Sequence, residues 1–372
     1  MQQVIRANFG LLVAGLLTFV LMGAGQSMYG PAIPAFARAF GLGPSEPALL
    51  ISAHWVGAAF GVGGMFLRGH LITPRVVVAA MAAGAALVAL GPVWSVTLLG
   101  AVFFGAGYGA STVIFNRRFL TRFGARGPAM VSFVNAIFGL GAISAPLIYV
   151  WLGSQPQLAY GLVAGLAVVT FLLAGSAGQD GVIEQVGAAE PFRLRPGILL
   201  FGMTAIAVEA CLIGLGPTAL IASGASEDRA AELLSMFFVA FLMVRLGLVV
   251  ISNLLPPFTM LILALGLAGV CALGAATVSA GPFFVMMGVF TGMFFPSFFV
   301  CATLQMGHDP RVTPTIIAAG LAGGITSPLI LGLVMARYGD GVFFWVIGVV
   351  ALMMALVGMG FMARMNRHNT MA

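Results

Sequence analysis

Apolar stretches long enough to cross a bilayer follow one another along almost the whole chain, and only short polar segments separate them. A helix needs about 20 apolar residues to cross about 30 Å of hydrocarbon, and only helices or closed barrels satisfy all of their backbone polar groups there. These stretches are too long and too uniform for barrel strands. The sequence therefore predicts an all-α polytopic membrane protein.

We expect twelve transmembrane helices in this chain. Their approximate bounds are 9–37, 48–67, 76–91, 96–115, 129–151, 158–177, 197–222, 230–251, 258–278, 282–304, 314–336 and 342–362. Composition agrees, because 61% of the 372 residues are hydrophobic and 7% are charged, which leaves too little polar surface for a soluble domain. The first stretch directly follows Arg6 and is longer than a cleavable signal, so we expect it to span the membrane.

The basic residues, all of them arginine, indicate how the chain is oriented. Twelve lie in the termini and in alternate connections: Arg6, Arg68, Arg75, Arg117, Arg118, Arg122, Arg126, Arg193, Arg195, Arg311, Arg364 and Arg367. The other connections contain only Arg38, Arg229 and Arg337. Because cytoplasmic loops are enriched in basic residues, both termini are predicted to be cytoplasmic. We expect a monomer surrounded by lipid in a bacterial inner membrane. We do not expect a nucleic-acid partner, because the sequence has no basic patch interleaved with aromatic residues.

The longest hydrophilic stretch divides the chain into halves of nearly equal length. We predict an N-terminal six-helix bundle at 1–178, a cytoplasmic linker at 179–196 and a C-terminal six-helix bundle at 197–372. The halves also resemble each other, because Gly30-Pro31 corresponds to Gly216-Pro217, and the segment GAISAP ending at Pro146 corresponds to GITSP ending at Pro328.

In these features the chain resembles the major facilitator superfamily. The resemblance implies two pseudo-symmetric six-helix bundles, with substrate bound midway between the halves. The segments GAGYGASTVIFN, ending at Asn116, and NAIFGLGA, starting at Asn135, resemble the fucose-permease-like branch, and a looser similarity links the chain to short bacterial importers of copper or riboflavin. Many members have an acidic residue four positions after a glycine that follows the second helix. Here Gly64 is followed by Arg68 instead.

Two ionisable residues lie well inside predicted spans, and such residues usually face a cavity or a partner. Glu209 precedes the Gly216-Pro217 kink, and we predict that it couples transport to protons or contacts the cargo. The alternative is a Glu209 neutralised by Arg245, which would hold spans seven and eight together. Arg245 could bind an anionic group of the cargo or extend toward the cytoplasmic surface.

Neutral polar side chains supply the other candidate substrate contacts. Gln26 and Tyr29 precede the Gly30-Pro31 break, where an interrupted helix exposes hydrogen-bonding groups. His54, beside Trp55, could gate access by titration or serve as an anchor at the membrane interface. Tyr108 and Asn135 are further candidates, although Asn135 and Asn116 could simply pair with each other.

An aromatic stripe in span ten suggests a ring-shaped cargo. Phe294 and Phe298 share one helix face and could line the site, or could be plain packing. A competing interpretation is copper import through soft sulfur ligands, with Met203, Cys211, Met236, Met243 and Met293 as ligands. Methionine as adaptable packing is the preferred interpretation.

The predicted function is secondary active transport by alternating access. The chain lacks a Walker-type phosphate loop, a His-Glu-x-x-His motif and a nucleophile elbow, so we expect neither an enzyme nor a cofactor. We predict a proton-coupled importer of a small organic solute such as a sugar or a vitamin. The alternatives are a copper importer, a multidrug efflux transporter, and a transport-inactive receptor or assembly factor.

Overall fold

The computed structural model describes residues 6–178, 192–251, 255–307, 309 and 311–367, and across these residues the regular structure is entirely helical. The chain divides into two compact units, Met1–Glu184 and Gln185–Ala372. Most of the predicted linker, 179–196, lies outside the described residues.

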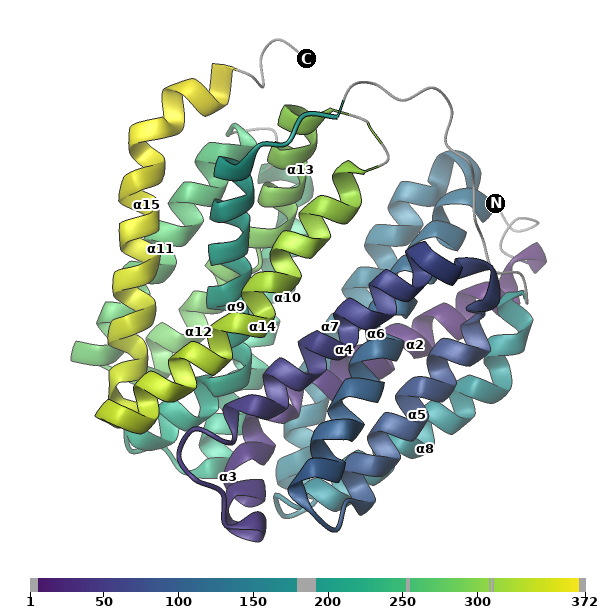
Figure 1. Ribbon diagram of the computed structural model, residues 1–372, viewed down its shortest axis with the longest axis horizontal. Helices are drawn as coiled ribbons and strands as arrows, with labels where there is room; N and C mark the ends of the chain where they lie inside the picture. The colour runs from purple at the N-terminus through teal and green to yellow at the C-terminus, as the bar shows by residue number, and fades with distance from the viewer. Residues whose placement is uncertain (1–5, 179–191, 252–254, 308, 310, 368–372) are drawn as a thin grey trace. The chain divides into compact units, whose positions relative to one another are not determined.

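The N-terminal unit contains six spanning segments, the first of which is interrupted (Figure 1). Its α-helices are α2 (Phe9–Ser27), α3 (Tyr29–Phe40), α4 (Ala48–Arg68), α5 (Pro74–Leu90), α6 (Trp94–Arg122), α7 (Gly127–Trp151) and α8 (Pro156–Ala174). Three short 3-10 helices follow α4, α6 and α8, namely η1 (Gly69–Leu71), η2 (Gly124–Arg126) and η3 (Gly175–Ala177).

The C-terminal unit repeats this plan, with its interruption in the fourth segment instead. Its α-helices are α9 (Pro196–Ala222), α10 (Glu227–Ile251), α11 (Pro257–Thr277), α12 (Ala280–Thr291), α13 (Phe294–Met306), α14 (Val312–Tyr338) and α15 (Phe343–Arg367), with η4 (Asp340–Val342) before α15.

The twelve predicted spans agree with these helices. Eleven helical segments in the described part of the chain are long and apolar enough to cross a membrane, with α12 and α13 counted as one. The remaining span is α5, an apolar helix of 17 residues. At 1.5 Å per residue it is about 25 Å long, which is close to the lower limit for crossing the hydrocarbon core. The prediction of an all-α polytopic membrane protein is confirmed.

Both interruptions occur where a proline removes a backbone hydrogen bond. Proline has no N–H group, so Pro31 cannot bond to the carbonyl of Ser27, and Pro296 cannot bond to that of Gly292. Accordingly, α2 ends at Ser27, and α12 ends at Thr291 just before Gly292. The predicted break at Gly30-Pro31 is therefore present, although the helix ends before these residues.

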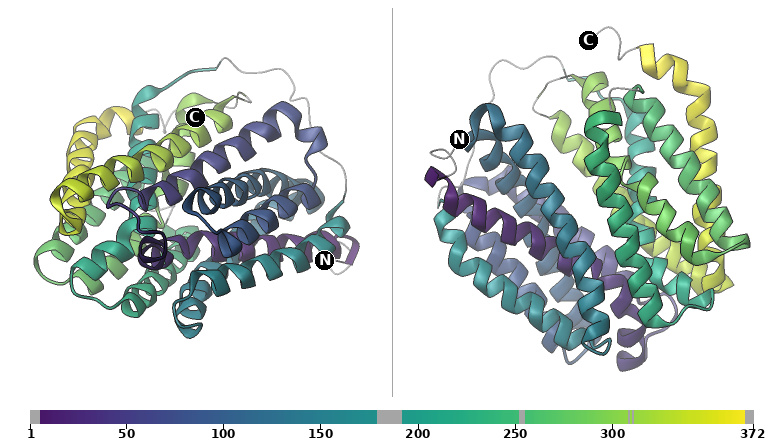
Figure 2. Two further views of the ribbon diagram at one scale, coloured as in Figure 1. Left: turned by 60° about the horizontal axis from the view of Figure 1, so that its bottom comes forward. Right: turned by 180° about the vertical axis from the view of Figure 1, so that it is seen from behind.

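Each unit is built from the same pairs of helices, as expected of an internal repeat. In the N-terminal unit α2 packs on α7, α4 and α5 pack on α6, and α5 packs on α8. The corresponding pairs in the C-terminal unit are α9 on α14, α10 and α11 on α12, and α11 on α15. The α2 helix also lies beside α8, as both views of Figure 2 show.

Glycines let paired helices approach closely inside each unit. A Cβ atom at Gly61 of α4 would overlap the Ala106 carbonyl of α6, and one at Gly105 of α6 would overlap the His54 carbonyl of α4. In the other unit, a Cβ atom at Gly288 of α12 would overlap the Phe237 carbonyl of α10. Without a hydrophobic driving force between helices in lipid, such close backbone contact is a main source of association.

Candidate functional site

An aromatic cluster occupies the interior of the N-terminal unit. We name it the N-terminal aromatic cluster, and its members are Tyr29 of α3, His54 and Trp55 of α4, Phe104 and Tyr108 of α6, Phe138 of α7 and Tyr160 of α8. The His54 ring is its centre, with ring centroids 5.2 Å from Tyr29, 5.0 Å from Tyr108 and 6.0 Å from Phe104.

The cluster has a buried part and a partly exposed part. Tyr29 and His54 are each 1% exposed, and Phe104 and Tyr160 are fully buried. Trp55, Tyr108 and Phe138 are partly exposed. Close helix packing produces this arrangement, because Gly25 of α2 leaves room for the Phe104 ring and Gly105 of α6 lies against the backbone of His54.

Several buried polar atoms in this region have no hydrogen-bond partner in the protein. They are the hydroxyl of Tyr29, both ring nitrogens of His54 and the Oε1 atom of neighbouring Gln26. The Tyr160 hydroxyl differs, because it donates to the Gly25 carbonyl at 3.1 Å. An unpaired polar atom in a protein interior costs about 1–3 kcal/mol, so such atoms usually have a ligand, a water molecule or a functional role.

Three of the predicted contact residues, Tyr29, His54 and Tyr108, are therefore brought together in one cluster, and Gln26 lies in the last turn of α2 beside Gly25. The suggestion that His54 is an anchor at the membrane interface is wrong, since its side chain is buried among four aromatic rings. Phe104, Phe138 and Tyr160 were not identified from the sequence, because an aromatic residue in an apolar helix carries no signal of which neighbour it meets.

Asn135 pairs with Asn116 between α7 and α6. Its Nδ2 atom donates to Asn116 Oδ1 at 3.0 Å and to the Val131 carbonyl at 2.8 Å. This is the interhelical pair that the sequence offered as the alternative to cargo binding. One hydrogen bond thus joins the two amides within the N-terminal unit.

Glu209 lies in the middle of α9, and its Oε2 atom is buried without a hydrogen-bond partner in the protein. Arg245 of α10 is close enough to act on it electrostatically. The described structure contains no hydrogen bond or ion pair that joins the two side chains. A direct salt bridge that holds α9 to α10 is thus not formed in this structure.

Arg245 instead compensates for the interruption between α12 and α13. Its Nε atom donates to the Gly292 carbonyl at 3.3 Å, and its guanidinium carbon lies 4.2 Å from the centroid of the Phe241 ring. The Gly292 carbonyl is the group that Pro296 leaves without a helical donor. A cation at the C-terminal end of α12 also interacts favourably with the helix dipole.

The aromatic stripe of span ten is mostly internal packing. Phe294 and Phe298 are both fully buried, and a Cβ atom at Gly202 of α9 would overlap the Phe298 ring. This arrangement favours the packing interpretation for both residues.

The five sulfur residues of the copper interpretation are distributed between surface and interior. Met236 and Met243 are 44% and 62% exposed, whereas Cys211 is 1% exposed. Met203 and Met293 are partly exposed. No group of three His, Cys, Asp or Glu side chains that could hold a metal ion occurs among the described residues. This distribution does not favour a copper site.

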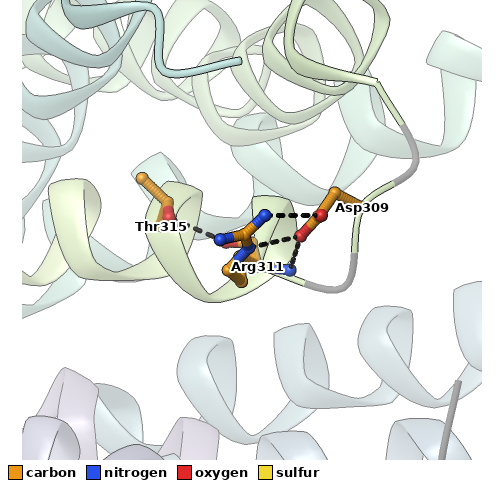
Figure 3. Close-up of polar contacts among 3 residues, drawn as sticks. All are labelled: Asp309, Arg311 and Thr315. Carbon is orange, nitrogen blue, oxygen red and sulfur yellow. Dashed lines mark hydrogen bonds and ion pairs between the residues drawn. The ribbon is translucent and has the colours of Figure 1, made fainter. Parts of the chain in front are cut away.

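An ion pair that sequence analysis missed lies in the connection between α13 and α14 (Figure 3). The Arg311 guanidinium donates to both carboxylate oxygens of Asp309 at 2.9 Å, and the Arg311 backbone N–H donates to Oδ1 at 2.8 Å. The Thr315 hydroxyl donates to the Arg311 carbonyl at 2.7 Å. These bonds hold the pKa of Asp309 below its usual value of 3.8.

The Arg311 guanidinium also covers Phe192, with its carbon 4.7 Å from the ring centroid. The segment before α9 is thereby attached to the connection between α13 and α14. The spacing Asp-x-Arg at the start of a helix was the available sequence signal.

The sequence model of a protein family, the Major Facilitator Superfamily, matches residues 15–319 of this chain. The chain belongs to the major facilitator superfamily. Solved structures agree on the fold, and the similar ones include a D-xylose-proton symporter with a TM-score of 0.74 at 14% identity, covering 94% of this chain and 97% of that one. A comparison with curated protein sequences finds no match.

Two further superfamily structures show the same fold. The peptide transporter POT has a TM-score of 0.77 at 13% identity, with 99% of each chain covered. The transporter FucP in its outward conformation has a TM-score of 0.61 at 16% identity, with 93% of this chain and 98% of that one covered.

This superfamily member departs from the expected acidic position after its second span, where Arg68 is exposed at the end of α4. In η3, which directly follows α8, the Ala177 carbonyl accepts a hydrogen bond from Arg118 of α6, and the Arg75 guanidinium lies against Gly175. Cations therefore lie at the carbonyl end of the segment formed by α8 and η3, as helix dipoles favour.

Proposed function

We propose that this superfamily member is a secondary active importer that moves a small organic solute together with protons, and that Glu209 is the coupling acid. The observation that carries the proposal is the buried Oε2 atom of Glu209, which has no hydrogen-bond partner in the protein. A carboxyl group that is not committed to a structural bond is free to take up and release a proton.

The hydrogen bond between Arg245 and the Gly292 carbonyl supports this role for Glu209. Arg245 donates to the Gly292 carbonyl, so it influences Glu209 through its charge and not through a direct bond. A full salt bridge would hold Glu209 ionised, since an adjacent guanidinium stabilises the carboxylate. A nearby cation that is held by another group leaves the acid able to exist in both protonation states.

The solved relatives support an organic cargo. The D-xylose-proton symporter and the peptide transporter POT both cover nearly the whole chain at low identity. We infer a small organic solute, and a monomer that works alone with membrane lipid around it. The distribution of Met236, Met243 and Cys211 between surface and interior argues against copper as the cargo.

Location and domain organisation are part of the proposal. The arginine-rich connections favour cytoplasmic termini in a bacterial inner membrane. We assign the two moving parts of alternating access to 1–178 and 197–372, joined by a linker at 179–196.

The test measures proton movement in proteoliposomes that contain a trapped pH-sensitive dye. Sugars, vitamins, amino acids, nucleobases, Cu(I) and cationic drugs are added outside in turn. We expect internal acidification with one organic class and loss of that signal in Glu209→Gln. Glu232→Gln is the matched control, because Glu232 is a surface acid of α10 that pairs with Arg229 at 2.8 Å.

Transport of Cu(I) alone would contradict the organic cargo, and organic uptake without proton movement would contradict the coupling. If no solute moves in either direction, the receptor or assembly-factor interpretation replaces transport.

A further inference from the structure

The N-terminal aromatic cluster combines two properties that packing alone does not require. Its rings form a continuous set of contacts over five spans, from α3 to α8. Its interior also holds the unpaired polar atoms of Tyr29 and His54, with Gln26 adjacent in the chain. A cluster selected only for packing would carry phenylalanine in place of Tyr29 and an apolar residue in place of His54, because each unpaired group costs stability.

We propose that this cluster is a cargo subsite for a neutral, planar nitrogen heterocycle, such as a pyrimidine, purine or flavin ring. The inference rests on the proposed transport function and names its substrate class. The Trp55, Tyr108 and Phe138 rings supply stacking surfaces, and Tyr29, His54 and Gln26 supply hydrogen bonds.

The geometry of the rings supports recognition of a flat molecule. Trp55 and Tyr108 meet His54 edge to face, at interplanar angles of 75° and 71°. All three partly exposed rings, Trp55, Tyr108 and Phe138, belong to one continuous set of contacts. A ring that stacks on these side chains gains about 1–3 kcal/mol per contact, judging from bases stacked on aromatic side chains.

The polar groups indicate what the edge of that ring must offer. The Tyr29 hydroxyl can donate and accept, a neutral His54 donates from one nitrogen and accepts at the other, and Gln26 Oε1 accepts. Heterocycles with adjacent N–H and C=O groups match this mixed set. A sugar would need more hydrogen-bonding groups than these three side chains provide.

The charge of the cluster excludes ionic cargo. None of its seven members, nor Gln26, carries a carboxylate or a guanidinium group. A cation would lack a counter-charge here, and an anion would lack a basic partner, so either would lose hydration without compensation. The cargo ring is therefore neutral.

The test measures binding to the purified full chain by equilibrium dialysis, with uracil, adenine and lumiflavin as ring probes and D-xylose and tetramethylammonium as comparators. We expect at least one ring probe to bind and to quench tryptophan emission. The quenching should be lost in Trp55→Phe while dialysis still detects binding.

Tyr29→Phe is the decisive variant, because it removes only a hydroxyl that has no partner in the protein and leaves the ring in place. We expect it to weaken ring binding about tenfold without lowering the thermal midpoint. Tyr338→Phe is the matched control, since Tyr338 is 74% exposed at the end of α14 and should leave binding unchanged.

Three results would overturn the subsite: binding of the sugar or the cation alone, unchanged ring binding in both Tyr29→Phe and His54→Gln, or no binding of any ring probe. Its failure can be separated from that of the transport proposal. A ring that binds but is not transported keeps the subsite and contradicts transport. Proton-coupled uptake of a sugar without ring binding keeps the transport proposal and contradicts the subsite.

Discussion

Asp309 shows how a single side chain can stabilise a connection between two membrane helices. It is 4% exposed and accepts three hydrogen bonds from Arg311, two from the guanidinium and one from the backbone. Bidentate bonds of this kind are stronger than ordinary neutral ones and fix the geometry of both partners. The Arg311 side chain is in turn stacked on Phe192.

Asp309→Asn should lower the thermal midpoint at pH 7, because the amide cannot replace the charged pair. The folded pKa of Asp309 is depressed below 3.8, so its stabilising contribution is present above that pH and is lost as the pH falls through the folded pKa. The difference between the two midpoints should therefore be full at pH 7 and should shrink only as the pH falls below 3.8. Equal midpoints at pH 7 would show that the pair does not stabilise the protein.

At this scale the pairing of Asn135 with Asn116 could be anticipated from the sequence, because two amides near the ends of neighbouring apolar helices have few other side-chain partners. The burial of His54 could not be anticipated, since α4 is apolar on most sides and the pattern does not show which face is buried. For the same reason, the sequence does not show that Phe104, Phe138 and Tyr160 belong to one cluster.

At the scale of elements, glycines decide which helices can touch. Gly61 and Gly63 are separated by a single residue on α4, but their surroundings differ completely. A Cβ atom at Gly61 would overlap the Ala106 carbonyl of α6, whereas nothing lies within 4 Å of one at Gly63.

Gly61→Ala should destabilise the protein by about 1–3 kcal/mol, because α4 and α6 must separate to admit the methyl group. Gly63→Ala is the matched control, and it should be neutral or slightly stabilising. Reversible unfolding in mixed micelles measures both. Equal effects of the two substitutions would mean that close contact between α4 and α6 does not stabilise the unit.

The interruption between α12 and α13 depends on a donor from outside the helix. Arg245→Met, which keeps the apolar stem but has no donor, should leave the Gly292 carbonyl without its bond and cost about 1–3 kcal/mol. Hydrogen exchange should then speed up around residues 289–297 and stay unchanged in α15.

Pro296→Ala offers a rescue, because it restores the backbone N–H that the Gly292 carbonyl lacks. The double variant Arg245→Met with Pro296→Ala should recover most of the lost protection. If the double variant exchanges as fast as Arg245→Met alone, Arg245 acts on this region in some other way.

The sequence predicted the break at Gly30-Pro31 but neither the one at Pro296 nor the residue that compensates for it. A proline removes one backbone N–H group but does not always end a helix, since α9 and α14 continue through Pro217 and Pro328. Arg245 lies 47 positions from Gly292, and its bond depends on how α10 packs against α12. Long-range pairing of this kind follows from tertiary structure and has no local signal.

At the scale of the whole molecule, length and hydropathy were sufficient to predict the architecture. An apolar stretch has few structural options in a bilayer, so the number of spans and the all-α class followed directly. Similar proline-containing segments in the two halves indicated the repeat, and both units pair their helices in the same order. The cargo was not predictable in the same way, because unrelated solutes are carried on one fold.

The most direct test of the account compares Glu209→Gln with the wild type in proteoliposomes, using the solute found by the proton-movement screen. Two modes are measured: exchange of solute across the membrane without a gradient, and accumulation driven by an inward pH gradient. We predict that Glu209→Gln keeps exchange within about threefold of the wild type, a barrier change below 1 kcal/mol, and loses accumulation. If Glu209→Gln still accumulates solute with the wild-type pH dependence, Glu209 is not the coupling acid.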